Sequence, residues 1–245
     1  MNHRRFLDVS TLIGCPLNCS YCPQSVLLSA YGNEKRLMDL DDIKSILKNV
    51  DKSISLVFAG FGENFFNPHF VDILIYSFTE GYEISLWTTL HGFNGVKLNE
   101  LKRSGISFKY CGFHQLVENK QFFDTLHSFH MNIPCEKWDI HIIEQPLSRA
   151  GNLPHIKSKY DSKPIICNFK YNGINSINTH NLVLPNGDVV ICCMDYGLKH
   201  KIGNLHTNNY DSSEFNNKKE ELAKLLLVEN SDIICRKCEC NKLIL

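Results

Sequence analysis

Residues 53–88 read SISLVFAGFGENFFNPHFVDILIYSFTEGYEISLWT, and this stretch decides the fold class. Ser53–Phe58 is a short apolar run typical of a buried strand. His69–Phe78 has the spacing of a helix, which Gly81 would end. Glu83–Thr88 is a second strand-like run. A strand, a helix and another strand in this order predict a parallel α/β sheet.

The same alternation fills the chain up to about residue 160. Further helices are expected at 39–50, 97–103 and 118–130, and further strands at 106–110 and 138–143. Asp39 and Asp42 would cap the first of these helices. A complete eight-fold barrel needs about 250 residues, roughly 30 for each unit. Residues 1–160 hold five or six units, so we expect a partial (β/α)6 TIM-like barrel.

The pattern changes in residues 161–245. Residues 182–191 predict a β-hairpin, because Asn186-Gly187 tolerates the positive φ of a type I′ turn. Asp211 and Glu214 would begin a helix that runs to about residue 229. We therefore predict a second, small hairpin-plus-helix domain with cysteines of its own.

The composition disfavours some classes of binding partner and points to a use for the cysteines. The chain has 245 residues, 26 basic and 26 acidic, and no basic–aromatic stripe, so neither nucleic acid nor a membrane surface is a favoured partner. No stretch approaches the roughly 20 apolar residues that span a bilayer. Eleven cysteines are an odd number and cannot all form intrachain disulfides. Metal or cluster binding in a cytoplasmic protein is the natural use of such thiols.

The first cysteine group is Cys15, Cys19 and Cys22, in a C-x3-C-x2-C arrangement. Three thiolates on one short loop suit a [4Fe–4S] cluster with one iron left open. Structural zinc normally takes four ligands, so a zinc site would need a distant fourth Cys or His.

This triplet, with Tyr21 before its last cysteine, resembles the radical SAM superfamily. The resemblance implies that S-adenosylmethionine (SAM) chelates the open iron and is cleaved to a 5′-deoxyadenosyl radical, with electrons from a protein such as flavodoxin or ferredoxin. Tyr21 would lie beside the adenine. Gly60, Gly62 and Glu63 resemble the loop that holds the methionine amino group in that family, although Asn64 replaces its usual proline.

Two further segments resemble parts of this family. Residues 88–92, Thr-Thr-Leu-His-Gly, are a degenerate match to a Thr-Asn-Gly segment, and we assign His91 no role. Arg149, in Arg-Ala-Gly after the fifth expected strand, falls at the catalytic end of the sheet. It could bind the SAM carboxylate, or a hydroxyl or phosphate of the substrate; the alternative is a surface arginine before a glycine turn.

The second cysteine group resembles the auxiliary-cluster domains called SPASM and twitch. One four-cysteine [4Fe–4S] cluster, as in the shorter twitch type, is implied on Cys167, Cys192, Cys235 and Cys238. Either Cys193 or Cys240 could replace one of them. A zinc ribbon is the alternative for a hairpin combined with C-x2-C.

In size and cysteine layout the chain is similar to the twitch-type dehydrogenases of cyclitol alcohols, the 2-deoxy-scyllo-inosamine dehydrogenase type. This resemblance implies an oxidoreductase that abstracts hydrogen from an alcohol carbon of a sugar or cyclitol, with the auxiliary cluster as electron acceptor. A peptide-modifying enzyme, a sugar epimerase and a non-catalytic zinc module remain alternatives. Only 14 residues precede Cys15, which favours a small-molecule substrate over a peptide.

Overall fold

The structure is a computed structural model that describes residues 5–115, 120–143, 146–167, 177 and 180–244. Its helices are α1 (Gln24–Tyr31), α2 (Leu40–Leu47), α3 (Phe70–Thr79), α4 (Gly95–Ser104), α5 (Lys120–Asn132) and α6 (Ser213–Leu225), with short 3-10 turns η1 (Asn64–Phe66) and η3 (Ile234–Lys237). Its strands are β1 (Phe6–Val9), β2 (Ser55–Phe58), β3 (Ile84–Thr88), β4 (Phe108–Gln115), β5 (Cys135–Ile142), β6 (Ile165–Cys167), β7 (His180–Val183), β8 (Asp188–Val190), β9 (Lys201–Asn204) and β10 (Asn241–Leu243).

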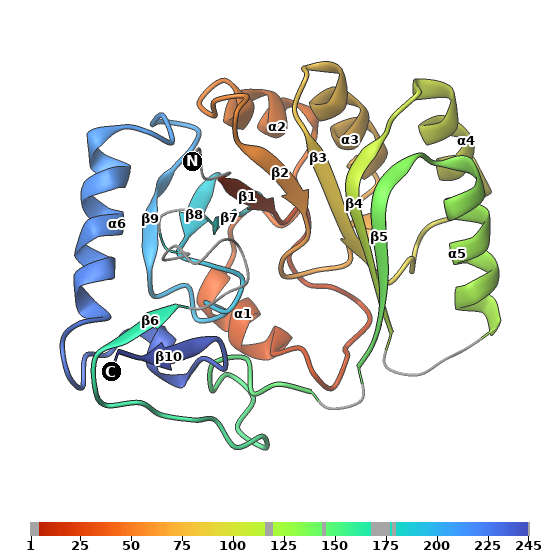
Figure 1. The fold of residues 1–245 in the computed structure, drawn as a ribbon. Coiled ribbons are helices and arrows are strands. Elements are labelled where there is room, and N and C mark those ends of the chain that lie inside the picture. The colour runs from red at the N-terminus through yellow and green to blue at the C-terminus, as the bar shows by residue number, and fades with distance from the viewer. Residues whose placement is uncertain (1–4, 116–119, 144–145, 168–176, 178–179, 245) are drawn as a thin grey trace.

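A single sheet organises the chain. Its strand order is β5-β4-β3-β2-β1-β7-β8-β9, and the six strands from β5 to β7 are all parallel (Figure 1). β8 and β9 then continue it antiparallel. The predicted α/β class with a parallel, barrel-like sheet is confirmed.

The hairpin joins the main sheet directly, because β7 pairs in parallel with β1. Val9 of β1 lies opposite Phe58 of β2 on one side and Val183 of β7 on the other. A separate two-stranded sheet pairs β10 with β6 near the last cysteines. The boundary at residue 160 therefore remains a prediction, with the sheet running through both proposed parts.

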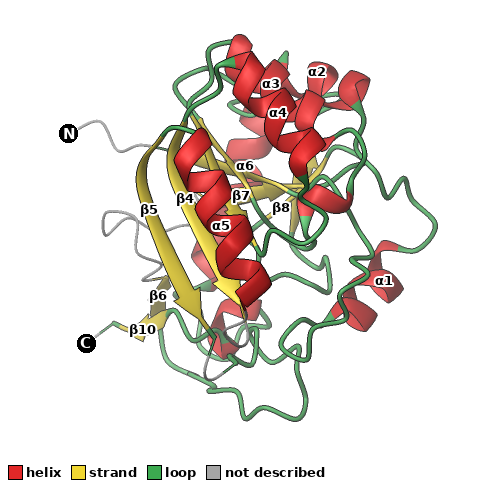
Figure 2. Cartoon of the chain, turned by 90° about the vertical axis from the view of Figure 1, so that its right-hand side faces the viewer, coloured by secondary structure: helices red, strands yellow, loops and turns green. Residues whose placement is uncertain are grey.

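Helices α3, α4 and α5 cover one face of β3, β4 and β5 (Figure 2). Leu86 and Phe113 point to that face, where Phe113 packs edge-on against Phe129 of α5 at 5.6 Å between ring centroids. Side chains at alternate positions point to the other face of these strands, which leaves it available for a functional site.

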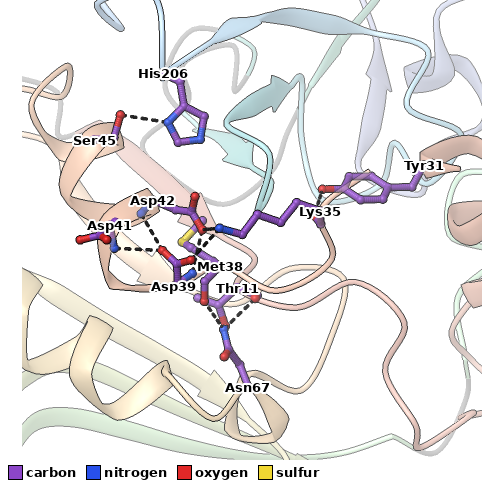
Figure 3. A network of polar contacts seen from close by, with 10 residues as sticks. All are labelled: Thr11, Tyr31, Lys35, Met38, Asp39, Asp41, Asp42, Ser45, Asn67 and His206. Carbon is purple, nitrogen blue, oxygen red and sulfur yellow. Dashed lines mark hydrogen bonds and ion pairs between the residues drawn. The ribbon is translucent and has the colours of Figure 1, made fainter. Parts of the chain in front are cut away.

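The predicted cap of α2 is confirmed. Asp39 accepts hydrogen bonds from the backbone amides of Asp41 and Asp42, and Asp42 accepts one from the amide of Asp39. Lys35 lies 2.7 Å from Asp39 and 2.6 Å from Asp42 (Figure 3). These contacts fix the segment that follows α1.

Two details of the predicted C-terminal half are wrong. The cap of α6 is Ser212, whose hydroxyl accepts from the Phe215 amide, because Asp211 is paired with Arg5. In the hairpin turn only Gly187 has a positive φ, of 81°, so the turn is not type I′, which needs two such residues.

The first two residues of the helix expected at 118–130 lie outside the described residues.

Among the helices that the structure describes, the longest have 13 residues. None of them is long and apolar enough to cross a bilayer.

Candidate active site

The cysteine triplet occupies the loop between β1 and α1. The amide of Cys22 donates to the carbonyl of Cys19 at 3.0 Å, so the last two cysteines share one turn. All three thiols are partly accessible. Gln24, at the start of α1, donates from Nε2 to the Cys22 sulfur at 3.2 Å.

The glycine loop after β2 packs directly against this cysteine loop. A Cβ on Gly60 would lie 2.9 Å from that of Ser10, and a Cβ on Gly62 would lie 2.8 Å from the carbonyl oxygen of Leu12. Burial raises the pKa of the Cys15 thiol, while hydrogen bonds from the amides of Leu17 and Glu63 oppose the rise. Both glycines are thus required by close contact with the segment that carries the cysteines.

Glu63 is buried and its carboxylate is fully engaged. One oxygen accepts from the Thr88 hydroxyl at 2.8 Å and the Phe65 amide at 3.2 Å. The other accepts from the amide and the hydroxyl of Thr89 at 2.6 and 2.7 Å. Burial raises the pKa of Glu63, and these hydrogen bonds oppose the rise. Glu63 therefore joins the ends of β2 and β3, which makes the degenerate Thr88–Thr89 segment part of the site.

Two asparagines of the same loop were missed in the sequence analysis. Asn64, at the position of the expected proline, accepts from the amide and hydroxyl of Thr11 at 3.0 and 2.7 Å. Asn67 donates to the carbonyls of Thr11 and Met38 at 2.9 and 2.8 Å (Figure 3). Asn-Pro motifs usually indicate turns, so nothing in the sequence distinguished these anchoring residues.

Arg149 lies against Tyr21. Its guanidinium carbon is 5.9 Å from the ring centroid, and its Nε donates to the Tyr21 carbonyl at 3.4 Å. Arg149 and Ala150 both have positive φ, 54° and 56°. Such backbone costs of order 1–3 kcal/mol per residue and clusters at functional sites.

Burial alone would lower the pKa of Arg149. The net effect is a raised pKa, because the negative charges of its neighbours outweigh burial; these are Tyr196, Cys193, Cys22 and Tyr21. Arg149 thus stays a cation close to residues of both cysteine groups. It also acts on His114 of β4. Burial, followed by the charges of Arg149 and His141, lowers the pKa of His114 to about 4.

Contacts from both C-terminal cysteine segments fix the Arg149 turn. Glu239, between Cys238 and Cys240, accepts from the amides of Ser148 at 2.6 Å and Ala150 at 3.4 Å. Asn152 donates to the carbonyls of Arg149 at 2.6 Å and Met194 at 3.0 Å.

The C-terminal cysteines face one cavity. Six of its lining residues are cysteines: Cys167, Cys192, Cys193, Cys235, Cys238 and Cys240. The four predicted ligands are brought together, along with the two alternatives. Burial, and then the charges of Cys193, Cys235 and Cys238, raise the pKa of Cys192 well above its usual value.

The residues around this cavity fit an iron–sulfur cluster. Soft thiolate ligands, with apolar neighbours such as Ile191 and Ile234, suit such a group. Across the described part of the chain, no three His, Cys, Asp or Glu side chains meet closely enough to hold a single metal ion. The thiols are instead arranged around a shared space.

Residues 9–125 match the Radical SAM superfamily, and residues 175–239 match SPASM, an iron–sulfur cluster-binding domain. The chain therefore contains a radical SAM region, residues 9–125, followed by a SPASM-type region, residues 175–239. The matches confirm the predicted iron–sulfur and SAM cofactors.

Solved structures share this fold. BtrN in complex with AdoMet and 2-DOIA is 16% identical with a TM-score of 0.64, over 96% of this chain and 95% of BtrN. Native anSMEcpe with bound AdoMet is 13% identical with a TM-score of 0.57, over 96% of this chain and 86% of anSMEcpe. SuiB of Streptococcus suis, bound to the precursor peptide SuiA, is 12% identical with a TM-score of 0.54, over 96% and 73%.

Among curated proteins, a probable dual-specificity RNA methyltransferase RlmN of Leptospira interrogans is 29% identical over 150 residues. The match covers 59% of this chain but only 38% of the methyltransferase.

Proposed function

We propose that this protein is a radical SAM oxidoreductase that removes hydrogen from an alcohol-bearing carbon of a sugar or cyclitol. The observation that carries the proposal is the half-buried cation of Arg149, which lies against Tyr21 of the triplet loop and close to Cys193 and Tyr196 of the second cysteine group. The proposed substrate loses a hydrogen atom near the first cysteine group and an electron to the second. A substrate bound beside Arg149 would be near both groups.

In this proposal, Cys15, Cys19 and Cys22 hold the first [4Fe–4S] cluster, and Tyr21, Gly60, Gly62 and Glu63 surround SAM. Cys167, Cys192, Cys235 and Cys238 hold the second cluster. When bound, the two clusters supply the electron that cleaves SAM and the acceptor for the electron that leaves the substrate. Glu63 acts by holding the glycine loop against β3, since its carboxylate is already fully hydrogen-bonded.

Arg149 has the catalytic role. Its guanidinium donates to the substrate hydroxyl and favours the ionised oxygen, because a fixed cation lowers the pKa of a nearby acid. Oxidation of the alcohol to a ketone then needs three losses: the carbon gives up a hydrogen atom, which ends in 5′-deoxyadenosine, the hydroxyl gives up its proton to solvent, and one electron leaves to the auxiliary acceptor. The Tyr21 carbonyl and the strained turn orient the guanidinium.

The test uses a cyclitol deuterated at the reacting carbon, with anaerobic enzyme, SAM and a flavodoxin reductant. One deuterium should appear in 5′-deoxyadenosine for each ketone formed. Arg149→Met should slow ketone formation about 10- to 100-fold, the value of one hydrogen bond to a charged group. Arg149→Lys, which keeps the charge, should retain more activity.

Deuterium returned to the product, or solvent hydrogen in an unoxidised product, would instead establish an epimerase. That reaction needs a thiol hydrogen donor. Cys111, a candidate on β4, is buried in the core between sheet and helices, which supports dehydrogenation. Turnover of a peptide but of no sugar or cyclitol would overturn the proposed substrate class.

A further inference from the structure

The face of β3–β5 that points away from α3–α5 carries a partly exposed aromatic cluster around Trp87. The indole of Trp87 lies across the backbone of Gly112, so closely that a Cβ at position 112 would be 2.4 Å from its Cε3 atom. The strand register explains this placement. Trp87, Gly112 and Asp139 lie side by side on three neighbouring strands, and the missing side chain in the middle lets the indole lie flat.

Polar and aromatic groups surround this indole. The rings of Tyr110 and His141 are centred 5.4 and 5.2 Å from it. Asp139 and His141 form a contact of 3.2 Å, and their side chains remain 56% and 46% exposed. The surface therefore offers an apolar plane bordered by an accessible carboxylate and an accessible imidazole.

The same face leads to Arg149. His114 is two residues beyond Gly112 on β4, so its side chain points to the same side of the sheet as Trp87. The positive charge of Arg149 reaches His114 and contributes to its lowered pKa. A ligand on the indole can therefore extend along β4 toward His114, near the carboxyl end of that strand.

We infer that Trp87, laid flat by Gly112, binds the C–H face of the polyhydroxylated ring, with Asp139 and His141 bonding hydroxyl groups at the ring edge. This inference rests on the proposed function and names the residues that select its substrate. The face of an indole carries partial negative charge and attracts the weakly positive C–H groups on the flat side of such a ring. A carboxylate accepts hydroxyl hydrogen bonds at that edge.

The experiment measures binding directly, with anaerobic holoenzyme saturated with SAM. The probes are scyllo-inositol, myo-inositol and glucosamine, with adenosine and a tryptophan-containing peptide as competing classes. Because the chain has two tryptophans, Trp138→Phe leaves Trp87 as the only one, and its emission should change when a cyclic polyol binds. Trp138 packs against His130 of α5, on the helix-covered side of the sheet, so its replacement should leave the affinity for polyols unchanged.

Two variants test the geometry. Gly112→Ala should lift the indole off the sheet and raise the Kd for the polyol at least 10-fold while Trp87 itself is retained. Asp139→Asn, at an exposed position that folding tolerates, should weaken polyol binding several-fold. An unchanged Kd in both variants would overturn the inference, as would tight adenosine or peptide binding without polyol binding.

The outcomes also separate this inference from the function. Polyol binding that depends on Trp87 but yields no ketone would refute dehydrogenation and keep the binding surface. Ketone formation with an unaltered KM in Gly112→Ala would refute the binding surface and keep dehydrogenation.

Discussion

Tyr196 connects the two cysteine groups through a single hydroxyl. It follows Cys192 and Cys193 in the chain, and its oxygen lies 3.8 Å from the sulfur of Cys22. Its ring packs on Phe61 of the glycine loop at 4.5 Å between centroids. When Cys22 is a cluster ligand, its sulfur can only accept this hydrogen bond.

We therefore expect Tyr196→Phe to lower the reduction potential of the first cluster, because hydrogen bonds to ligand sulfurs favour the reduced, more negative state. A redox titration followed by electron paramagnetic resonance measures the shift. Tyr31→Phe is the matched control, since Tyr31 is buried in the same apolar cluster but donates to the carbonyl of Lys35. Equal potentials in Tyr196→Phe and the control would contradict the expectation.

Among single residues, the sequence predicted those whose function requires a fixed spacing along the chain. The two cysteine groups were recognisable because thiolate ligands must recur at short intervals. Asn64, Asn67 and Tyr196 were not, because each acts through a partner distant in sequence. The Tyr196–Cys22 contact spans 174 positions, and no local pattern encodes it.

At the scale of elements, α6 carries an unusual buried lysine. Lys219 is 3% exposed, and its ammonium lies 3.7 Å from the centre of the Tyr210 ring. Burial lowers its pKa to about 8, although Asp211 opposes the shift. Folding therefore favours the neutral amine, whereas the unfolded chain holds its proton up to about pH 10.5.

Lys219→Met should stabilise the protein at pH 7. A pKa lowered from 10.5 to about 8 corresponds to a cost of about 3 kcal/mol, of which the cation–π contact returns up to about 2 kcal/mol. We expect a gain of about 1–3 kcal/mol, which shrinks as the pH rises from 8 toward 10.5, where the wild-type lysine is neutral in the fold.

Anaerobic urea denaturation at pH 7 and pH 9.5 measures this gain. Lys218→Met, at a largely exposed position in the same helix, should change stability by less than about 0.5 kcal/mol. A gain that persists undiminished at pH 9.5 would show that packing, not charge, is its cause.

Elements with strong caps or long periodic runs were predictable, as α2 and the central strands show. β1 and α1 were not. β1 has only four residues, and α1 has eight residues with no side-chain cap at its start. Their stability comes from tertiary neighbours, since β1 pairs with both β2 and β7.

On the scale of the whole molecule, the two cysteine groups occupy separate sites on one framework. Glu239 and Asn152 tie the Arg149 turn to the auxiliary segments without using any residue of the triplet. Buried Arg236 donates to the carbonyls of Asp161 and Lys163 at 2.7 and 2.6 Å, so the C-terminal segment has its own internal support.

Each of the two cysteine sites should therefore bind its iron independently of the other. Wild-type protein should hold about eight irons, and the triple Cys15/Cys19/Cys22→Ala variant should keep about four while losing SAM cleavage. Cys135→Ala, at a cysteine outside both groups, should keep all of them. Zinc in place of iron in the triple variant would instead support a zinc ribbon.

The placement of β7 beside β1 has a consequence for biosynthesis. About 170 residues separate β1 from β7, its second neighbour in the sheet, so β1 leaves the ribosome well before β7 is made. At roughly 5–20 residues per second, that interval is on the order of ten to thirty seconds. During it, β1 presents an unpaired edge next to the loop of Cys15, open to other chains. The nascent protein is thus most exposed to aggregation and to thiol oxidation before β7 has been translated.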